Sequence, residues 1–300
     1  MLVVCALGGN AILPRGAPPA VDTERERIRA AAGALAELAA DHELGVTHGN
    51  GPQIGLLAMQ DEAFAGSAAT PLDVRGAESE GEIGYLLEQE LANALGTRRV
   101  ATLLTQVVVD GFDPAFADPT KPIGPSFEPW AAARITAERG WPMRRDGRGM
   151  RRVVPSPEPR SIVELEAIRL LVEADVTVIC AGGGGVPVTA GPDGALRGVE
   201  AVVDKDLTAE LLARELGADA LLLLTDVAAV ERDWGTPEAT PLGEATVPEL
   251  RGLALEPGSM APKAEAACRF AEHGGFAAIG ALEDAAELLA GRAGTRVVSD

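Results

Sequence analysis

Short apolar runs alternate along the chain with longer segments in which apolar residues recur every three or four positions. Runs rich in Val, Leu and Ile and bounded by glycine are typical of buried parallel strands, whereas the longer segments have the spacing of amphipathic helices. The apolar runs are residues 2–7, 44–47, 100–109, 176–180, 220–224, 277–279 and 295–298. Their alternation with helical segments predicts an α/β protein with an open parallel sheet.

The helical segments are predicted at residues 23–41, 78–95, 161–174 and 206–216, and a further helix carries Lys263 in its first turn. Two of them begin with a capping box, Thr23 to Glu26 and Ser161 to Glu164. In such a box the Ser or Thr and the Glu satisfy backbone N–H groups at the helix start. Gly96 is expected to end the second helix.

The amino-acid composition of the sequence changes after Asp110. Until about Pro159 it is rich in Pro, Gly, Trp and Arg, with few runs long enough to build a core. Structureless loops of this length are uncommon in compact domains unless they are functional. We therefore predict a single domain over residues 1–300, with residues 112–159 as an inserted, protruding subdomain or lid.

Three of the apolar runs end directly in glycine-rich loops. The loops are Gly8-Gly9-Asn10, His48-Gly49-Asn50-Gly51 and Gly182 to Gly185. Backbone N–H groups in such loops can form a concave anion site at the carboxyl edge of a parallel sheet. The three loops therefore predict one shared anion site.

The loop that begins at His48 has a competing interpretation. Residues 48–55 resemble a dinucleotide-binding fingerprint with one residue too many before the last glycine. The acidic residue expected about 20 positions further on is poorly placed, because Asp73 falls in a turn-like segment. A nicotinamide cofactor is therefore disfavoured. His48 could contact a substrate, but a hydrogen-bonded place in the scaffold is the commoner role for such a histidine.

Arginine supplies nearly all of the positive charge. Of 26 Lys and Arg residues, only Lys121, Lys205 and Lys263 are lysines. Because lysine is ordinarily among the commonest residues, those that remain are candidates for positions where a planar guanidinium cannot replace a compact ammonium. All three lie among Gly, Pro or Asp residues, which favours positioned roles.

Lys205 lies between two aspartates at the start of a predicted helix, downstream of the glycine run. This context suggests phosphate chemistry. The alternative is that Asp204 or Asp206 caps the helix and Lys205 is a solvated neighbour. Lys263 lies in the first turn of its helix, where a cation opposes the helix dipole, so we expect a negative group beside it.

Charge and cysteine content exclude several classes of function. The net charge of −19 repels polyanions, and no basic stripe with interleaved aromatic residues offsets it, so nucleic acid is not an expected partner. The three cysteines are far apart, which predicts reduced thiols in a cytoplasmic protein. No apolar stretch approaches the ~20 residues of a membrane span. An arginine cluster within the insertion either faces an anion or counters the acidic body: Arg144, Arg145, Arg148, Arg151 and Arg152.

Several catalytic motifs are missing from the sequence. It contains no P-loop, no Gly-x-Ser-x-Gly elbow, no His-Glu-x-x-His and no Cys-x-x-Cys. Trp234, in a loop, could stack on a base or cover the apolar underside of its loop.

Taken together, eight motifs in order resemble the carbamate kinases of the amino acid kinase superfamily, over nearly the whole chain. They are residues 7–11, 48–53, 104–110, 119–125, 153–157, 182–185, 199–206 and 257–263. The resemblance implies an open αβα sandwich with a lid subdomain, and a homodimer. It also implies reversible phosphoryl transfer between carbamoyl phosphate and ADP, giving ATP and carbamate, with Mg²⁺ as cofactor. The rival hypotheses are another amino acid kinase, acting on acetylglutamate or a nucleoside monophosphate, and a non-catalytic nucleotide sensor.

The resemblance also implies roles for individual residues. Lys205 and Lys263 would contact the transferring phosphoryl group. Asp206 would orient these lysines, and Lys121 would reach in from the lid. The phosphate end of the substrate would be held by Gly8, Gly9, Asn10, Gly49, Asn50, Gly51, Gly182, Gly183 and Gly184. The nucleotide would be bordered by Thr225, Asp226, Val227, Trp234 and Met260.

Overall fold

The computed structural model describes residues 1–9, 21–63, 70–147, 149–256 and 258–300. Its centre is an eight-stranded sheet in the order β15-β17-β16-β12-β1-β2-β9-β3. Neighbouring strands are parallel except for β16 and β17. In that order the strands are β15 (Glu244–Thr246), β17 (Thr295–Val298), β16 (Phe276–Ala281), β12 (Ala220–Thr225), β1 (Leu2–Leu7), β2 (Glu43–His48), β9 (Val176–Ile179) and β3 (Arg99–Thr102).

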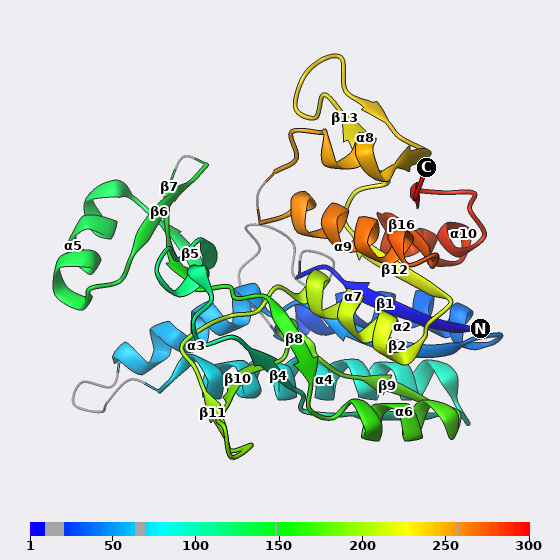
Figure 1. Ribbon diagram of the computed structural model, residues 1–300, viewed down its shortest axis with the longest axis horizontal. Helices are drawn as coiled ribbons and strands as arrows, with labels where there is room; N and C mark the ends of the chain where they lie inside the picture. The colour runs from blue at the N-terminus through cyan, green and yellow to red at the C-terminus, as the bar shows by residue number, and fades with distance from the viewer. Residues whose placement is uncertain (10–20, 64–69, 148, 257) are drawn as a thin grey trace.

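Helices cover both faces of this sheet (Figure 1). On one face lie α2 (Val21–Ala39), α4 (Leu72–Leu95) and α10 (Ala285–Leu289), and on the other α6 (Leu165–Glu173), α7 (Lys205–Leu216), α8 (Val247–Arg251) and α9 (Met260–Glu272). Strand β1 shows how the sequence specifies two cores, because Val4 and Ala6 pack on the α7 side while Val3, Cys5 and Leu7 pack on the α2 side. The fold is thus the expected αβα sandwich with a mainly parallel sheet.

A smaller second sheet has the order β11-β10-β4-β8. Its strands are β4 (Gln106–Val109), β8 (Pro159–Ile162), β10 (Val186–Ala190) and β11 (Leu196–Gly198). The apolar run 100–109 was predicted as one strand, and this was wrong. The Leu103 N–H still donates to the Ile179 carbonyl of the main sheet at 2.9 Å, whereas the Thr105 carbonyl accepts from Val186 of the second sheet at 2.8 Å. The chain therefore changes sheets between β3 and β4.

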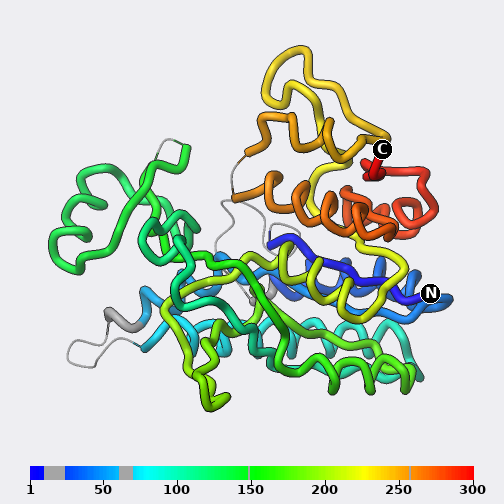
Figure 2. Tube along the Cα trace, in the orientation of Figure 1, coloured from blue at the N-terminus to red at the C-terminus, as the bar shows by residue number. Residues whose placement is uncertain are grey.

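The chain between β4 and β8 forms a subdomain that protrudes from the body (Figure 1). It contains a three-stranded sheet in the order β5-β7-β6. Its elements are β5 (Lys121–Phe127), α5 (Pro129–Arg139), β6 (Met143–Asp146) and β7 (Gly149–Val154), preceded by the short helix η1 (Pro114–Phe116). Both chain termini lie on the opposite side of the molecule (Figure 2).

Both predicted capping boxes were wrong. Ser161 lies in β8, and helix α6 begins four residues after it. The Glu164 carboxylate accepts instead from the backbone N–H of Gln106 at 2.7 Å, so it fixes the start of β4. Thr23 lies inside α2, which starts at Val21.

Two helix starts also differ from the prediction. Helix α4 begins at Leu72, after Pro71, although residues 71–73 were expected to form a turn. A helix that the sequence did not suggest, α3 (Gly51–Ala63), follows the β2 loop. None of the helices in the described part of the chain combines the length and hydrophobicity needed to span a membrane.

The protruding subdomain rests on α3 through two glycines. A Cβ atom added at Gly55 of α3 would lie 1.9 Å from the Gly124 Cα atom of β5, so the two backbones are in direct contact. Gly124 also has a φ of +70°, which favours glycine. Ile54 and Ile123 beside this contact belong to a small apolar cluster that joins the subdomain to the body.

The variant Gly55→Ala is expected to be destabilised by about 1–3 kcal/mol, because the new methyl group must push the β5 backbone away. The measurement is urea unfolding. Gly33→Ala in α2 is the matched control, since a Cβ there meets nothing within 4 Å. It should raise stability by about 0.5–1 kcal/mol, as Ala is the better helix former. Equal stabilisation of both variants would contradict the backbone contact.

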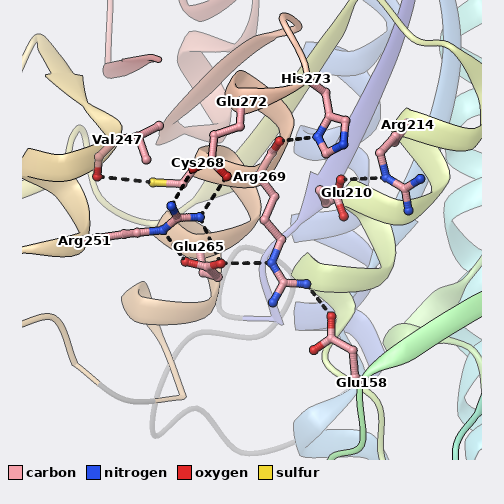
Figure 3. Close-up of polar contacts among 10 residues, drawn as sticks. All are labelled: Glu158, Glu210, Arg214, Val247, Arg251, Glu265, Cys268, Arg269, Glu272 and His273. Carbon is pink, nitrogen blue, oxygen red and sulfur yellow. Dashed lines mark hydrogen bonds and ion pairs between the residues drawn. The ribbon is translucent and has the colours of Figure 1, made fainter. Parts of the chain in front are cut away.

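A network of ion pairs connects α9 to its surroundings (Figure 3). Arg251 of α8 bonds to Glu265 of α9 at 3.0 Å, and Glu265 also accepts from Arg269 at 2.9 Å. Arg269 pairs in addition with Glu158, whose backbone N–H donates to Asp113 at 3.0 Å. Partly exposed pairs of this kind each contribute at most about 1 kcal/mol. Their main effect is to fix α9 relative to the base of the protruding subdomain.

Candidate active site

The three glycine-rich loops meet at one edge of the central sheet. They follow β1, β2 and β9, which lie side by side and run parallel. The first loops are tied to the sheet, because the Gly8 N–H donates to Leu224 at 2.7 Å and the Gly49 N–H donates to Leu7 at 3.0 Å. The expected convergence is therefore present. Asn10, one of the predicted site residues, lies outside the described residues.

Lys205 and Lys263 come from different helices and meet on one carboxylate. Lys205 Nζ donates to Asp206 Oδ1 at 2.6 Å, and Lys263 Nζ donates to Asp206 Oδ2 at 3.1 Å. Asp206 is 3% exposed and Lys263 is 6% exposed. Asp206 is thus the negative group expected beside the first turn of α9.

Asp204 has the capping role that was considered for it, since its Oδ1 atom accepts from the Asp206 N–H at 2.9 Å. Lys205 is nevertheless not a solvated neighbour, because only 13% of its side chain is exposed. A Cβ at Gly49 would lie 3.0 Å from its Cδ and Cε atoms, so the lysine stem lies on the β2 loop. Asp204 therefore caps the helix, and Lys205 lies against the glycine loop rather than in solvent.

The electrostatics of the three groups are shaped by burial and by mutual attraction. Burial lowers the pKa of Lys205 to about 8, against the opposing effect of Asp206. For Asp206, burial alone would raise the pKa, but the two lysines outweigh it and hold the pKa below its usual range. Burial also acts to lower the pKa of Lys263, and Asp206 reverses this into a net rise. The site thus presents two buried cations at neutral pH.

Lys121 reaches from β5 of the protruding subdomain into the same region. Its Nζ atom is paired with Asp204 Oδ2, so one carboxylate both caps α7 and holds the subdomain lysine. The three lysines of the chain are therefore gathered at one place. The scarcity of lysine in the sequence pointed to this grouping.

A cleft of about 770 Å³ lies between the glycine loops, the lysines and the subdomain. From the body it is lined by Gly8, Gly9, Gly49, Asn50, Gly51, Gly183, Asp204, Lys205, Asp206, Thr225 and Lys263, and from the subdomain by Lys121 to Ser126, Asp146 and Arg151. Both subdomain cations that line the cleft have a carboxylate partner, since Lys121 pairs with Asp204 and Arg151 pairs with Asp146 at 2.9 Å. An anionic ligand that binds Lys121 or Arg151 would therefore have to displace the carboxylate with which that cation is paired.

The glycine run contributes fewer N–H groups than the sequence suggested. The Gly182 N–H donates to Glu80 at 2.9 Å, the Gly184 N–H to Ala181 at 3.1 Å, and the Gly185 N–H to Gly182 at 3.0 Å. Among the described residues no acceptor is found for the N–H of Gly183, which is also the one that lines the cleft. Glycine is required in the run because φ is positive at Gly183, Gly184 and Gly185, and because a Cβ at each would lie 2.1–2.4 Å from a neighbouring atom.

The predicted nucleotide residues are divided. Thr225 lines the cleft, and its hydroxyl donates to Asp226 at 3.1 Å. Among the predicted residues, those that do not line it are Asp226, Val227, Trp234, Met260, Gly182 and Gly184. Trp234 is 58% exposed, in the loop between β13 (Glu231–Arg232) and β14 (Thr240–Pro241).

His48 and the arginine cluster now have defined places. His48 is fully buried and is not among the residues that line the cleft. Burial lowers its pKa to about 4, and its Nδ1 atom lies 3.4 Å from the Gly49 carbonyl, which agrees with a scaffold role. Arg151 lines the cleft, Arg144 pairs with Asp118, and Arg152 stacks on a tryptophan ring at 3.8 Å. Among the described arginines of the cluster, the anion-facing interpretation therefore fits Arg151.

Comparisons with known proteins agree with this geometry. The profile of the amino acid kinase family matches residues 1–279. The chain therefore belongs to the amino acid kinase family. Over the full chain it is 49% identical to the carbamate kinase of Rhizobium meliloti, covering 94% of that protein. It is 47% identical to the carbamate kinase of Pyrococcus furiosus, covering 99% of this chain and 98% of that one.

A solved structure gives the same result. The carbamate kinase of Giardia lamblia bound to AMP-PNP is 38% identical and superposes with a TM-score of 0.89, covering 100% of this chain and 98% of the other. Within the amino acid kinase family, the chain belongs to the carbamate kinases.

Proposed function

We propose that the protein transfers a phosphoryl group reversibly between carbamoyl phosphate and ADP, giving ATP and carbamate. The observation that carries this proposal is the meeting of Lys205 and Lys263 on Asp206 beside the glycine loops. Buried ammonium groups stabilise the charge of a transferring phosphoryl group, and a loose transition state requires little else from the protein.

The chemical step balances without a catalytic base. A β-phosphate oxygen of ADP forms the new P–O bond while the bond between phosphorus and the carbamoyl oxygen breaks, and carbamate leaves as an anion. No proton has to be removed from the attacking oxygen. A mechanism without a base assigns no proton transfer to His48, and this agrees with its burial and its neutral state near pH 7.

We assign roles by position. Lys205 and Lys263 contact the transferring phosphoryl group, and Asp206 fixes the distance between them. Loop residues that line the cleft hold the phosphate end of the substrate: Gly8, Gly9, Gly49, Asn50, Gly51 and Gly183. Lys121 exchanges Asp204 for a substrate oxygen when the cleft is filled, so the protruding subdomain acts as a lid. The nucleotide extends from Thr225 toward Asp226, Val227, Trp234 and Met260.

Magnesium is proposed to arrive with the nucleotide. Among the described residues there is no group of three or more His, Cys, Asp and Glu side chains that could hold a metal ion. This fits Mg²⁺, which usually binds through one or two carboxylates together with substrate phosphates and water. The cleft carboxylates beside the lysines, Asp204 and Asp206, already accept from Lys121, Lys205 and Lys263, so the ion would be held mainly by the nucleotide phosphates and water. When bound, the ion neutralises charge on the phosphates.

We also propose a cytoplasmic homodimer. All three cysteines are unpaired and buried, which agrees with a reducing compartment. The dimer rests on the family resemblance, and light scattering on the purified protein measures it.

The test of the function is a coupled assay for ATP formed from ADP and carbamoyl phosphate. Acetyl phosphate in place of carbamoyl phosphate, and ATP with acetylglutamate or a nucleoside monophosphate, are the comparison reactions. Preference for one of those acceptors would favour a different amino acid kinase. Nucleotide binding without ATP formation would favour a sensor, although the retention of both buried lysines speaks against one.

The rate should decline as the pH rises through about 8. Lys205 has its pKa lowered to about 8 by burial, and a lysine loses its positive charge above its pKa. The parameter to measure is kcat/KM between about pH 6 and 10, because it reports groups of the free enzyme. A profile that stays flat to pH 10 would show that the Lys205 charge does not take part.

A further inference from the structure

Two adjacent polar residues in the first half of α4 have no place in the mechanism described so far. Ser79 is 0% exposed and Glu80 is 1% exposed. Burial raises the pKa of Glu80 to about 8, against the opposing effect of the Gly182 and Thr105 N–H groups, which favour the charged carboxylate. Apolar side chains at these two positions would be buried at a lower cost in free energy than a hydroxyl and a carboxyl group.

Glu80 holds the loop that follows β9. Its Oε1 atom accepts from the Gly182 N–H at 2.9 Å, and its Oε2 atom accepts from the Thr105 N–H at 3.4 Å. Thr105 in turn accepts from the Ala181 N–H, through its hydroxyl, at 2.9 Å. Ala181 has a φ of +51°, an uncommon conformation for a residue with a side chain. Helix α4 and Thr105 therefore fix the start of the glycine turn.

Ser79 holds the loop that follows β2. Its hydroxyl accepts from Asn50 Nδ2 at 2.8 Å and donates to the Gly76 carbonyl at 2.8 Å, so its orientation is set by the helix itself. The Asn50 side chain has little freedom left on its other side. A Cβ added at Gly183 would lie 2.1 Å from Asn50 Nδ2, so the two loops touch at this point.

The two loops that α4 holds from behind both face the cleft. Asn50 and Gly183 line it. The Gly183 N–H has no acceptor in the part of the chain that the structure describes, and so can donate to a ligand. A shift of either loop would change the distance between the Asn50 side chain and the Gly183 N–H. This distance sets the width of the pocket proposed for the phosphate group.

We propose that Ser79 and Glu80 are positioning residues. They set the distance between the Asn50 side chain and the Gly183 N–H, which lie on either side of the phosphoryl group of carbamoyl phosphate. The proposal rests on the proposed function. It predicts a specific kinetic effect, because misplacing either group disturbs the alignment of the reacting groups but not the binding of the distant nucleoside. Misplacement by about 1 Å can lower a rate about a hundredfold.

The test compares Ser79→Ala and Glu80→Gln with the unaltered protein in the ATP-forming assay. Ser79→Ala removes the acceptor of Asn50. Glu80→Gln keeps the shape of the side chain but leaves it a single acceptor oxygen for two N–H groups. Each variant should lower kcat about tenfold or more while the KM for ADP changes less than about twofold.

Glu90→Gln is the matched control. Glu90 is also a buried carboxylate of α4, but it pairs with Arg29 of α2 at 3.1 Å, away from the cleft. It should lower the thermal midpoint and leave kcat within about twofold, as expected for a group that affects stability alone.

The outcomes separate the two proposals. If the unaltered protein makes no ATP from ADP and carbamoyl phosphate, the proposed function itself fails. If it is active and both variants retain kcat within about twofold, or lose kcat and ADP binding to the same degree, the positioning role is overturned. Because the variants alter different loops, Ser79→Ala decides the question if Glu80→Gln does not fold.

Discussion

Lys263→Ala and Lys205→Ala are each expected to lower turnover at least about a hundredfold, comparable to the loss of an oxyanion donor. Each removes a buried ammonium from the cleft, where the low exposure makes its interaction with a phosphoryl group strong. Asp206 keeps one partner in either variant, so the fold should survive. The measurement is kcat in the coupled ATP assay, with circular dichroism to confirm folding.

Two further variants sharpen this prediction. Lys205→Arg should also be impaired, because the planar guanidinium is larger and the stem of Lys205 is confined against Gly49. Arg214→Ala removes a cation of the same helix that pairs with Glu210 at 3.2 Å outside the cleft, and should leave kcat nearly unchanged. Near-normal rates for both lysine-to-alanine variants would defeat the assigned roles.

Asp206→Asn is expected to abolish most activity and to destabilise the protein by about 3 kcal/mol or more. It leaves two buried ammonium groups that repel each other without a shared carboxylate. Asp206 is also the main charge that raises the pKa of Lys205, which burial has already lowered to about 8. Without Asp206 the Lys205 pKa falls further, and the amine becomes neutral near physiological pH.

The direction of the pH effect distinguishes lost charge from lost structure. In Asp206→Asn the remaining activity should recover as the pH is lowered, because Lys205 regains its proton below its reduced pKa. The measurement is kcat/KM against pH for the variant and the unaltered protein, together with urea unfolding. If kcat/KM declines at the same alkaline pH in the variant as in the unaltered protein, Asp206 does not control the charge of Lys205.

The convergence of the site could be predicted because it follows from strand order. Parallel strands that end in glycine deliver their loops to one edge, so the positions of Gly8, Gly49 and Gly183 followed from the sequence once a parallel sheet was expected. The rarity of lysine singled out Lys205 and Lys263 independently. In the structure both lysines donate to the Asp206 carboxylate.

Other features gave no usable signal in the sequence. Ser79 and Glu80 stand in an acidic stretch with Glu78 and Glu82, which has the composition of a solvated helix face. Their burial depends on the turn packed against them from distant strands, and no local pattern records that.

The break between β3 and β4 was missed for a similar reason. Residues 100–109 contain no glycine or proline, so nothing in the run marks the exit from the main sheet. The turn occurs because Thr105 satisfies Ala181 and Val186 at the junction of two sheets. Only tertiary contacts select that position.

The hydrogen bond from Glu158 to Asp113 joins the points where the chain leaves and rejoins the main body. Because the two ends of the inserted segment are adjacent, the insertion does not change the topology of the main body. The 44 residues between them, 114–157, are therefore a single insertion, which adds Lys121 and Arg151 to the cleft without changing the strand order of the main sheet.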